Sequence, residues 1–408
     1  MLVMRNKTMP EATGRLPGAT THAEMELLLC CARTRASTEM TRRIRAAARK
    51  EIDWVQFIRL VLRHDTVALT YRNLHRNCPD LVPSGVLEPL RARHEAESAE
   101  GRVLAEELVD VLGFLDSQGI SAVTYKGPTL AVRLYGDLSL RGFGDLDIMV
   151  GEQDAPRARR LLLDRGYAPE RVSTGDLSDF LREHHEMLFY RVDGKVRLDL
   201  HWRFTSRSAC LAGDPERFLQ YLETISLAGA ELRSLRLETY LLVLSIHAAK
   251  HQWVQLKLIC DIAEILAVTD LDWEFVLREA DDLGLKRVLG TGLLLAQDLL
   301  DSVVPLKLAQ DLKIDRTAKA LAVQARTRLF EEPDERWGLQ GGITSQMEIR
   351  ERLRDRAKIF LRHFLPKLRP GERDRWFLPL PSALSAVYYV VRPVRLVLQK
   401  MGRTGQLP

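Results

Sequence analysis

The sequence has few of the features that mark secreted, membrane-anchored or redox-active proteins. Its 408 residues include five cysteines, an odd number, and none of them forms a CxxC pair. Reduced thiols that serve as small apolar side chains are therefore expected. The N-terminus has no apolar core followed by a cleavage site, so no secretory signal is predicted. Together these absences predict a cytoplasmic protein.

Several well-known catalytic motifs are also missing. The chain has no GxxxxGK[ST] phosphate loop, no GxSxG nucleophile turn and no protein-kinase catalytic loop. The formal net charge of +5 is small for this length. That charge is compatible with phosphate-bearing substrates but is far from that of a nucleic-acid-binding protein, so nucleic acid is not an expected partner.

No hydrophobic run has the length that a membrane-spanning helix requires. Residues 376–391 are uncharged, but Pro379 and Pro381 break the start of this segment, and a spanning helix needs about 20 apolar residues. Basic residues follow it, namely Arg392, Arg395, Lys400 and Arg403. Such a segment favours either docking on a membrane surface or a protein partner, or a packed terminal helix.

What the sequence does contain is the composition of a soluble globular protein, with 46% hydrophobic and 28% charged residues. The predicted fold class is α+β, with a small mixed sheet flanked by helical regions. The predicted regions are a disordered start at 1–20, a helical region at 21–118, an α+β core at 119–236, a helical subdomain at 237–330 and a basic, amphipathic helical extension at 331–408. Within the first helical region, single helices are expected at 23–50, 53–74 and 86–118.

The stretch from 125 to 150 combines a turn that can bind phosphate with a pair of carboxylates. Lys126 and Gly127 close an apolar run and open a helical pattern, so backbone N–H groups and a positive helix end would meet a phosphate. Asp145 and Asp147 lie in a second apolar run, which is predicted to be a strand over 146–150. Since side chains alternate along a strand, both carboxylates project from the same face. Two such carboxylates are most readily held together by a divalent cation.

A third carboxylate lies on a predicted β-hairpin. Residues 186–192 and 195–202 form its two strands across an Asp-Gly dipeptide, which is a strong turn signal. In the second strand, Asp199 and His201 fall on the polar face. Asp199 therefore points towards the other two carboxylates if this strand pairs beside theirs.

The order Lys-Gly, apolar helix, Arg141 and then Gly-Asp-Leu-Asp before an apolar tail resembles the nucleotidyltransferase superfamily that includes DNA polymerase β. Within it the chain looks most like the bacterial uncharacterised nucleotidyltransferases, over residues 53–300 and most strongly over 123–203. The resemblance implies a nucleotidyltransferase core that moves a nucleoside monophosphate from a nucleoside triphosphate to an acceptor. It also implies two Mg²⁺ ions as cofactors, held by three catalytic carboxylates, namely Asp145, Asp147 and Asp199.

The resemblance also assigns groups to the triphosphate. It places the backbone of Gly127 and the side chain of Lys126 on the phosphates, with Arg141 as a further phosphate partner. Arg141 could instead form a structural ion pair with Asp137. The turn contains Gly-Pro where many relatives have Gly-Ser or Gly-Gly. Pro128 suits the first position of a helix, and it removes one N–H donor from the phosphate site.

Further residues near the expected site come from the helical subdomain and from the hairpin. By the same resemblance, Lys250 or His251 would reach the phosphates from a helix that covers the nucleotide. His201 would contact substrate or support Asp199, and His247 is expected to support these groups from behind. The acceptor is expected to be a hydroxyl of a small molecule, a peptide or a protein, and an RNA end also remains open.

Two alternatives lead to other classes of protein. Residues 247–265 are predicted to form one helix that places His247, His251 and Asp261 along one stripe, and HxxxH spacing can ligate a metal. A metal-dependent hydrolase built on these three residues is therefore an alternative. The other alternative is a catalytically silent interaction or scaffold protein. His184 and His185 are adjacent and diverge on any regular element, so they are expected to be loop residues near the site.

Overall fold

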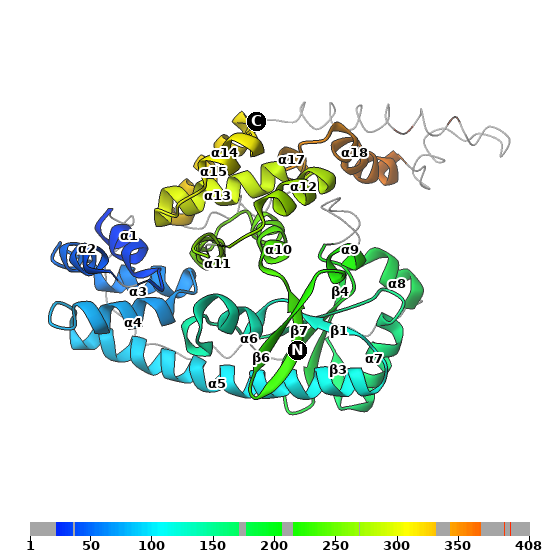
Figure 1. The fold of residues 1–408 in the computed structure, drawn as a ribbon, viewed down its shortest axis with the longest axis horizontal. Helices are drawn as coiled ribbons and strands as arrows, with labels where there is room; N and C mark the ends of the chain where they lie inside the picture. Colours follow the sequence, from blue (N-terminus) through cyan, green and yellow to red (C-terminus); the bar gives the residue numbers. More distant parts are fainter. Residues whose placement is uncertain are drawn as a thin grey trace, which may run out of the picture.

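The computed structural model describes residues 22–35, 37–170, 177–205, 215–268, 270–331 and 343–368, together with Val387 and Arg392. Within these ranges a seven-stranded mixed sheet has helices before and after it in the chain, which confirms the predicted α+β class. In Figure 1 the first helices lie at the left, the sheet at the lower right and the later helices above both. The start at 1–20, and all but two residues of the uncharged and basic segment after 375, lie outside the described residues.

Five helices precede the sheet. Two of the predicted helices are each divided into two. At the first break Ser37 accepts a hydrogen bond from the backbone N–H of Met40 and so begins a new helix, whereas Thr66 at the second break makes no such side-chain cap. Asp65 has a positive φ of 52° at the second break. The helices are α1 His22–Cys31, α2 Thr38–Ala48, α3 Trp54–Arg63, α4 Val67–Asn77 and α5 Ser84–Ser117.

Helix α5 joins the N-terminal helices to the sheet. It is 34 residues long and runs beneath both in Figure 1. Leu90 near its start packs with the N-terminal helices, whereas Leu104, Leu108 and Leu115 pack in the cluster that includes the strands. Each fully buried leucine stabilises this connection by about 1.5–3 kcal/mol. The helix predicted at 86–118 is therefore confirmed to within two residues at each end.

The sheet has the strand order β3-β4-β5-β2-β1-β7-β6. The pairs β2–β5 and β1–β7 are parallel, and the remaining neighbours are antiparallel. The strands are β1 Ala122–Thr124, β2 Leu146–Val150, β3 Tyr167–Pro169, β4 Glu186–Arg191, β5 Arg197–His201, β6 Leu222–Leu227 and β7 Ala230–Leu235. The strand predicted at 146–150 and the predicted hairpin are confirmed, whereas β3, β6 and β7 are absent from the predicted set.

Strand β2 is buried on both of its faces. Leu146, Ile148 and Val150 belong to a cluster with α5 and with α7 Ala155–Asp164, and Met149 belongs to the cluster that contains helix α10. Because side chains alternate along a strand, Asp147 shares the face of Met149. The sequence of β2 therefore directs Asp147 away from α5 and α7 and towards the later helices.

Short helical segments connect the strands, and longer helices follow them. The connecting segments are α6 Gly127–Leu130, the π-helical turn η1 Ala131–Tyr135, the 3₁₀ turn η2 Leu138–Leu140, α8 Leu177–Glu183 and α9 Pro215–Leu219. The later helices are α10 Leu237–Lys250, α11 Leu256–Leu266, α12 Trp273–Leu283, α13 Lys286–Leu300, α14 Leu306–Leu312, α15 Arg316–Phe330, α17 Ile343–Glu348 and α18 Leu353–Leu368. Among the described residues, no helix has the length and apolar character needed to cross a membrane.

The single helix predicted across residues 247–265 is wrong. Helix α10 ends at Lys250 and α11 begins at Leu256. Gln252 and Trp253 both have positive φ in the intervening turn, and buried Trp253 donates its backbone N–H to Ala248. The two halves of the predicted stripe therefore lie on different helices.

Candidate active site

The turn between β1 and α6 delivers Lys126 and Gly127 to the sheet. Gly127 has a φ of +62°, and a Cβ at this position would lie 3.1 Å from the backbone oxygen of Asp145, so glycine fits here without strain. Pro128 lies in the first turn of α6, as predicted, and the Thr129 hydroxyl donates to the Lys126 carbonyl at 3.0 Å. The turn is thus packed directly against the segment that begins β2.

The parallel pairing of β2 and β5 brings two carboxylates together. Asp147 and Asp199 are direct Cα partners, and Met149 and His201 are partners two residues further on. Ligating atoms of Asp147, Asp199 and His201 all lie within 4.8 Å of one another. Among the described residues, this is the group of histidine, cysteine and acidic side chains with the spacing of a metal site.

Asp147 is a buried carboxylate held in its ionised form. Its Oδ1 lies 2.7 Å from the Nζ of Lys126 and 2.9 Å from the Nε2 of His201. Burial alone would raise its pKa, but the adjacent Lys126 and His201 hold the pKa of Asp147 well below its usual range. Lys126 therefore reaches the carboxylates, and its role on the triphosphate stays a prediction.

Asp199 has the opposite electrostatic character. Burial raises its pKa to about 6, against the lowering effect of Arg197. Arg197 donates to Oδ2 of Asp199 at 3.2 Å, whereas Oδ1 is buried and has no hydrogen-bond partner. A buried acceptor without a donor costs stability unless something positive approaches it. Oδ1 of Asp199, together with Asp147 and His201, fits a divalent cation.

Asp145 lies at the edge of this group rather than within it. It is more exposed than Asp147, and its Oδ2 is 3.7 Å from the same nitrogen of Arg197 that contacts Asp199. The guanidinium therefore lies between two of the three predicted carboxylates. Whether Asp145 ligates a cation stays a prediction.

A chain of polar contacts connects the strands to the end of α10. Glu186 Oε2 lies 3.2 Å from His201 Nδ1 and 3.3 Å from His185 Nε2, and the same His185 nitrogen lies 3.2 Å from Lys250 Nζ. Burial opposes ionisation of Glu186, but His185, His201 and Lys250 hold its pKa below the usual range. Glu186 is absent from the predicted site, although the hairpin register that pairs it with His201 could have indicated it.

Helix α10 brings histidines close to the same carboxylates. The rings of His247 and His251 pack at 4.7 Å between centroids. Burial, together with nearby Lys126, lowers the pKa of His247 well below its ordinary value, and burial and Lys250 lower that of His251. A lowered pKa favours the neutral imidazole, which keeps one N–H donor and one nitrogen acceptor, and the roles of both histidines towards substrate stay predictions.

Arg141 pairs with Asp261 and not with Asp137, the partner expected for a structural ion pair. Its Nε and Nη2 donate to the two carboxylate oxygens of Asp261 at 2.8 and 2.9 Å, and Tyr135 donates to the same Asp261 at 2.7 Å. Asp137 instead caps the turn through the backbone N–H of Ser139. Since Asp261 is fully buried and paired, a hydrolase site that joins it to His247 and His251 is not assembled.

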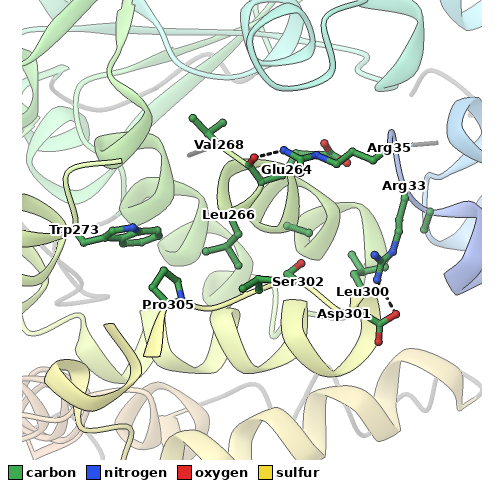
Figure 2. A pocket seen from close by; sticks show the side chains of 14 residues that line it. Arg33, Arg35, Glu264, Leu266, Val268, Trp273, Leu300, Asp301, Ser302 and Pro305 are labelled. Carbon is green, nitrogen blue, oxygen red and sulfur yellow. Dashed lines mark hydrogen bonds and ion pairs between the residues drawn. The ribbon is translucent and has the colours of Figure 1, made fainter. Parts of the chain in front are cut away.

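One cavity lies beside the candidate site residues, and another lies away from them. A cavity of about 230 Å³ is lined by Asp199 and by Phe180 of α8, so it opens beside the carboxylates. A cavity of about 360 Å³ lies between α1, α11 and α13, where Arg33 pairs with Asp301 at 3.1 Å (Figure 2). The second cavity has none of the candidate site residues in its lining.

A protein family and a solved structure resemble this chain. The family described as an uncharacterised nucleotidyltransferase matches residues 50–301. No curated protein matches the chain. The crystal structure of an antigenic nucleotidyltransferase-like protein from Paracoccidioides brasiliensis is 17% identical, with 54% of this chain and 97% of that chain covered and a TM-score of 0.32. Because the family match covers more than half of the chain, this protein belongs to the uncharacterised nucleotidyltransferase family.

Proposed function

We propose that the protein transfers a nucleoside monophosphate from a nucleoside triphosphate to an acceptor hydroxyl, with divalent cations held by Asp145, Asp147 and Asp199. One observation carries the proposal. Asp147 and Asp199 are direct partners on neighbouring parallel strands, and the buried Oδ1 of Asp199 has no hydrogen-bond donor. When bound, divalent cations would stabilise the charge on the transferring phosphate and on the leaving pyrophosphate.

The triphosphate is proposed to lie over the turn between β1 and α6. The backbone at Gly127 and the ammonium group of Lys126 are on the same side as Asp147, since Lys126 contacts its carboxylate directly. Lys250 extends from the last turn of α10 towards the same region, where it contacts His185. These two cations would bind phosphate oxygens and hold the α-phosphate close to the carboxylates.

In the proposed reaction, the acceptor oxygen attacks the α-phosphorus in line with the leaving group. The new oxygen–phosphorus bond forms as the bond from the α-phosphorus to the bridging oxygen breaks, and pyrophosphate leaves with that electron pair. The acceptor proton passes to the carboxylate of Asp199. In the cation-free chain burial raises the pKa of Asp199 to about 6, which supports proton uptake by this carboxylate.

The acceptor is proposed to enter the cavity of about 230 Å³ beside Asp199. A polar acceptor with a small apolar part would fit there with its hydroxyl next to the base, because most of the lining is charged or polar. The lining residues are Glu170, His184, His185, Glu186, Arg197 and Asp199, with Phe180, Met187 and Leu188. The size favours a small molecule or a single side chain of a peptide or protein. Nucleic acid is a poor fit for a cavity of this volume.

A transfer assay separates this proposal from the silent-scaffold alternative. The protein is incubated with each α-labelled nucleoside triphosphate, Mg²⁺ or Mn²⁺, and a panel of small hydroxyl compounds, peptides and proteins. We expect label on an acceptor together with release of pyrophosphate, and neither product with Asp147→Asn. Tight binding of nucleotide without transfer to any acceptor would instead favour the scaffold.

A further inference from the structure

His201 lies between two carboxylates. Its Nε2 is 2.9 Å from Asp147 Oδ1, and its Nδ1 is 3.2 Å from Glu186 Oε2, although this second contact is not aligned as a hydrogen bond. Glu186 and His201 are direct partners across β4 and β5, so strand pairing holds the carboxylate beside Nδ1. Without a metal, Nε2 donates to the ionised Asp147; a cation would displace that proton, and the Glu186 carboxylate beside Nδ1 would favour the tautomer with the proton on Nδ1 and Nε2 on the metal.

The three ligating atoms have separations that suit one cation. In an octahedral site with bonds of about 2.1 Å, adjacent ligand atoms are roughly 3.0 Å apart and opposite ones roughly 4.2 Å. The 2.9 Å between His201 Nε2 and Asp147 Oδ1 corresponds to adjacent ligands. Asp199 contributes an atom within 4.8 Å of both, so a small side-chain shift completes the set.

We propose that Asp147, Asp199 and His201 form a mixed nitrogen and oxygen site that takes a first-row transition-metal cation such as Mn²⁺ in preference to Mg²⁺. This inference rests on the proposed function and names the cation class of the same site. Mg²⁺ favours oxygen ligands and keeps several waters, whereas imidazole suits transition metals. All three side chains are buried. Asp145 is more exposed and stays outside this position.

The probe is Mn²⁺ added to the EDTA-treated full chain without nucleotide. Pulsed electron paramagnetic resonance of bound Mn²⁺ detects a directly coordinated ¹⁴N as a modulation of the spin echo. We expect this modulation in the wild type and its loss in His201→Gln, which replaces the ring by an amide. It is expected to persist in His247→Gln, a matched control because the half-buried His247 is near enough to Asp147 to interact with it electrostatically but contributes no atom to the group. Circular dichroism establishes that each variant is folded.

Competition between cations gives a second readout. In the wild type, Mn²⁺ is expected to bind more tightly than Mg²⁺. The dissociation constant for Mg²⁺ divided by that for Mn²⁺ should fall about tenfold or more in His201→Gln. Glu186→Gln should weaken Mn²⁺ binding by about 10–100-fold while the nitrogen modulation persists, because this residue only orients the ring. If His201→Gln does not fold, the nitrogen modulation of the wild type and the Mn²⁺ affinity of Glu186→Gln still test whether His201 binds the cation.

Failure of the wild type to bind Mn²⁺, bound Mn²⁺ without nitrogen modulation, or an unchanged ratio in His201→Gln would overturn this inference. Nucleotide transfer supported by Mg²⁺ would in those cases leave the proposed function intact. Nitrogen modulation in a protein that transfers no nucleotide would support the mixed site and contradict the proposed function.

Discussion

Asp147 and Asp199 face each other as direct partners on the parallel strands β2 and β5. Their environments drive their ionisation in opposite directions. Lys126 and His201 hold the pKa of Asp147 down, whereas burial raises that of Asp199 to about 6. Without a bound cation, the two carboxylates therefore differ in how readily they take up a proton.

Replacing Asp199 by asparagine tests its catalytic role. Asp199→Asn keeps the size of the side chain but removes the base and a cation ligand, so the transfer rate should fall by about 10²–10⁴-fold. Asp193→Asn is the control, because Asp193 lies on the exposed turn of the same hairpin, where it pairs with Arg191. Rates of α-labelled nucleotide transfer measure both variants. Equal rates for Asp199→Asn and the wild type would exclude Asp199 as the base.

Stability should depend on pH through the Asp199 carboxyl. Because its folded pKa is raised from 3.8 to about 6, the folded protein binds more protons than the unfolded chain between these values. The free energy of unfolding therefore falls as pH rises through this window, by roughly 2–3 kcal/mol in total. Asp199→Asn should melt above the wild type at pH 7.5 in EDTA and lose this advantage near pH 4. A difference in melting temperature that is the same at both pH values would contradict this assignment.

Arg141 and Asp261 are predicted to stabilise the junction between η2 and α11. Both are buried and joined by two hydrogen bonds, so Arg141→Met leaves the buried Asp261 carboxylate without its cation, with the Tyr135 hydroxyl still donating to it, and should cost about 3–5 kcal/mol. Arg91→Met is the control, because Arg91 and its partner Glu88 on α5 are both exposed. Thermal unfolding measures both. A melting temperature for Arg141→Met equal to that of the wild type would favour the phosphate role instead.

Gly127 is expected to be intolerant of any side chain. With φ at +62° and the Asp145 carbonyl 3.1 Å from a built Cβ, Gly127→Ala should cost about 1–2 kcal/mol and displace the turn that is proposed to bind the triphosphate. Gly113→Ala is the matched control on α5, where nothing lies within 4 Å and alanine should add up to about 1 kcal/mol of stability. Calorimetry and nucleotide titration follow both variants. Unchanged stability and nucleotide affinity in Gly127→Ala would contradict this account of the turn.

Local signals in the sequence predicted the elements that carry the site. The alternation of 146–150 and the Asp-Gly turn of the hairpin correspond to β2, β4 and β5. The hairpin of β6 and β7 was not predicted because its turn is Ala228-Gly229. Both residues have positive φ, 49° and 81°, and alanine rarely occupies such a position. The break between α10 and α11 contains neither glycine nor proline, so no residue there indicated the end of a helix.

Long-range partners could not be predicted in the same way. The spacing of Arg141 from Asp145 suggested a phosphate ligand, yet both carboxylate oxygens of Asp261 accept hydrogen bonds from it. The contact of Glu186 with His201 depends on the register of β4 and β5, and that of Lys126 with Asp147 on the packing of a turn against β2. Such contacts are set by the tertiary fold, which periodicity alone does not specify.

The most direct test of the central claim is the affinity for a non-hydrolysable nucleoside triphosphate with and without divalent cations, because this measurement needs no acceptor. Calorimetric titration should show that Mg²⁺ or Mn²⁺ tightens binding at least about tenfold in the wild type and in Asp193→Asn. Asp147→Asn should lose this enhancement while it remains folded. Affinity in the wild type that is the same with and without cations, or enhancement that survives in Asp147→Asn, would contradict the claim.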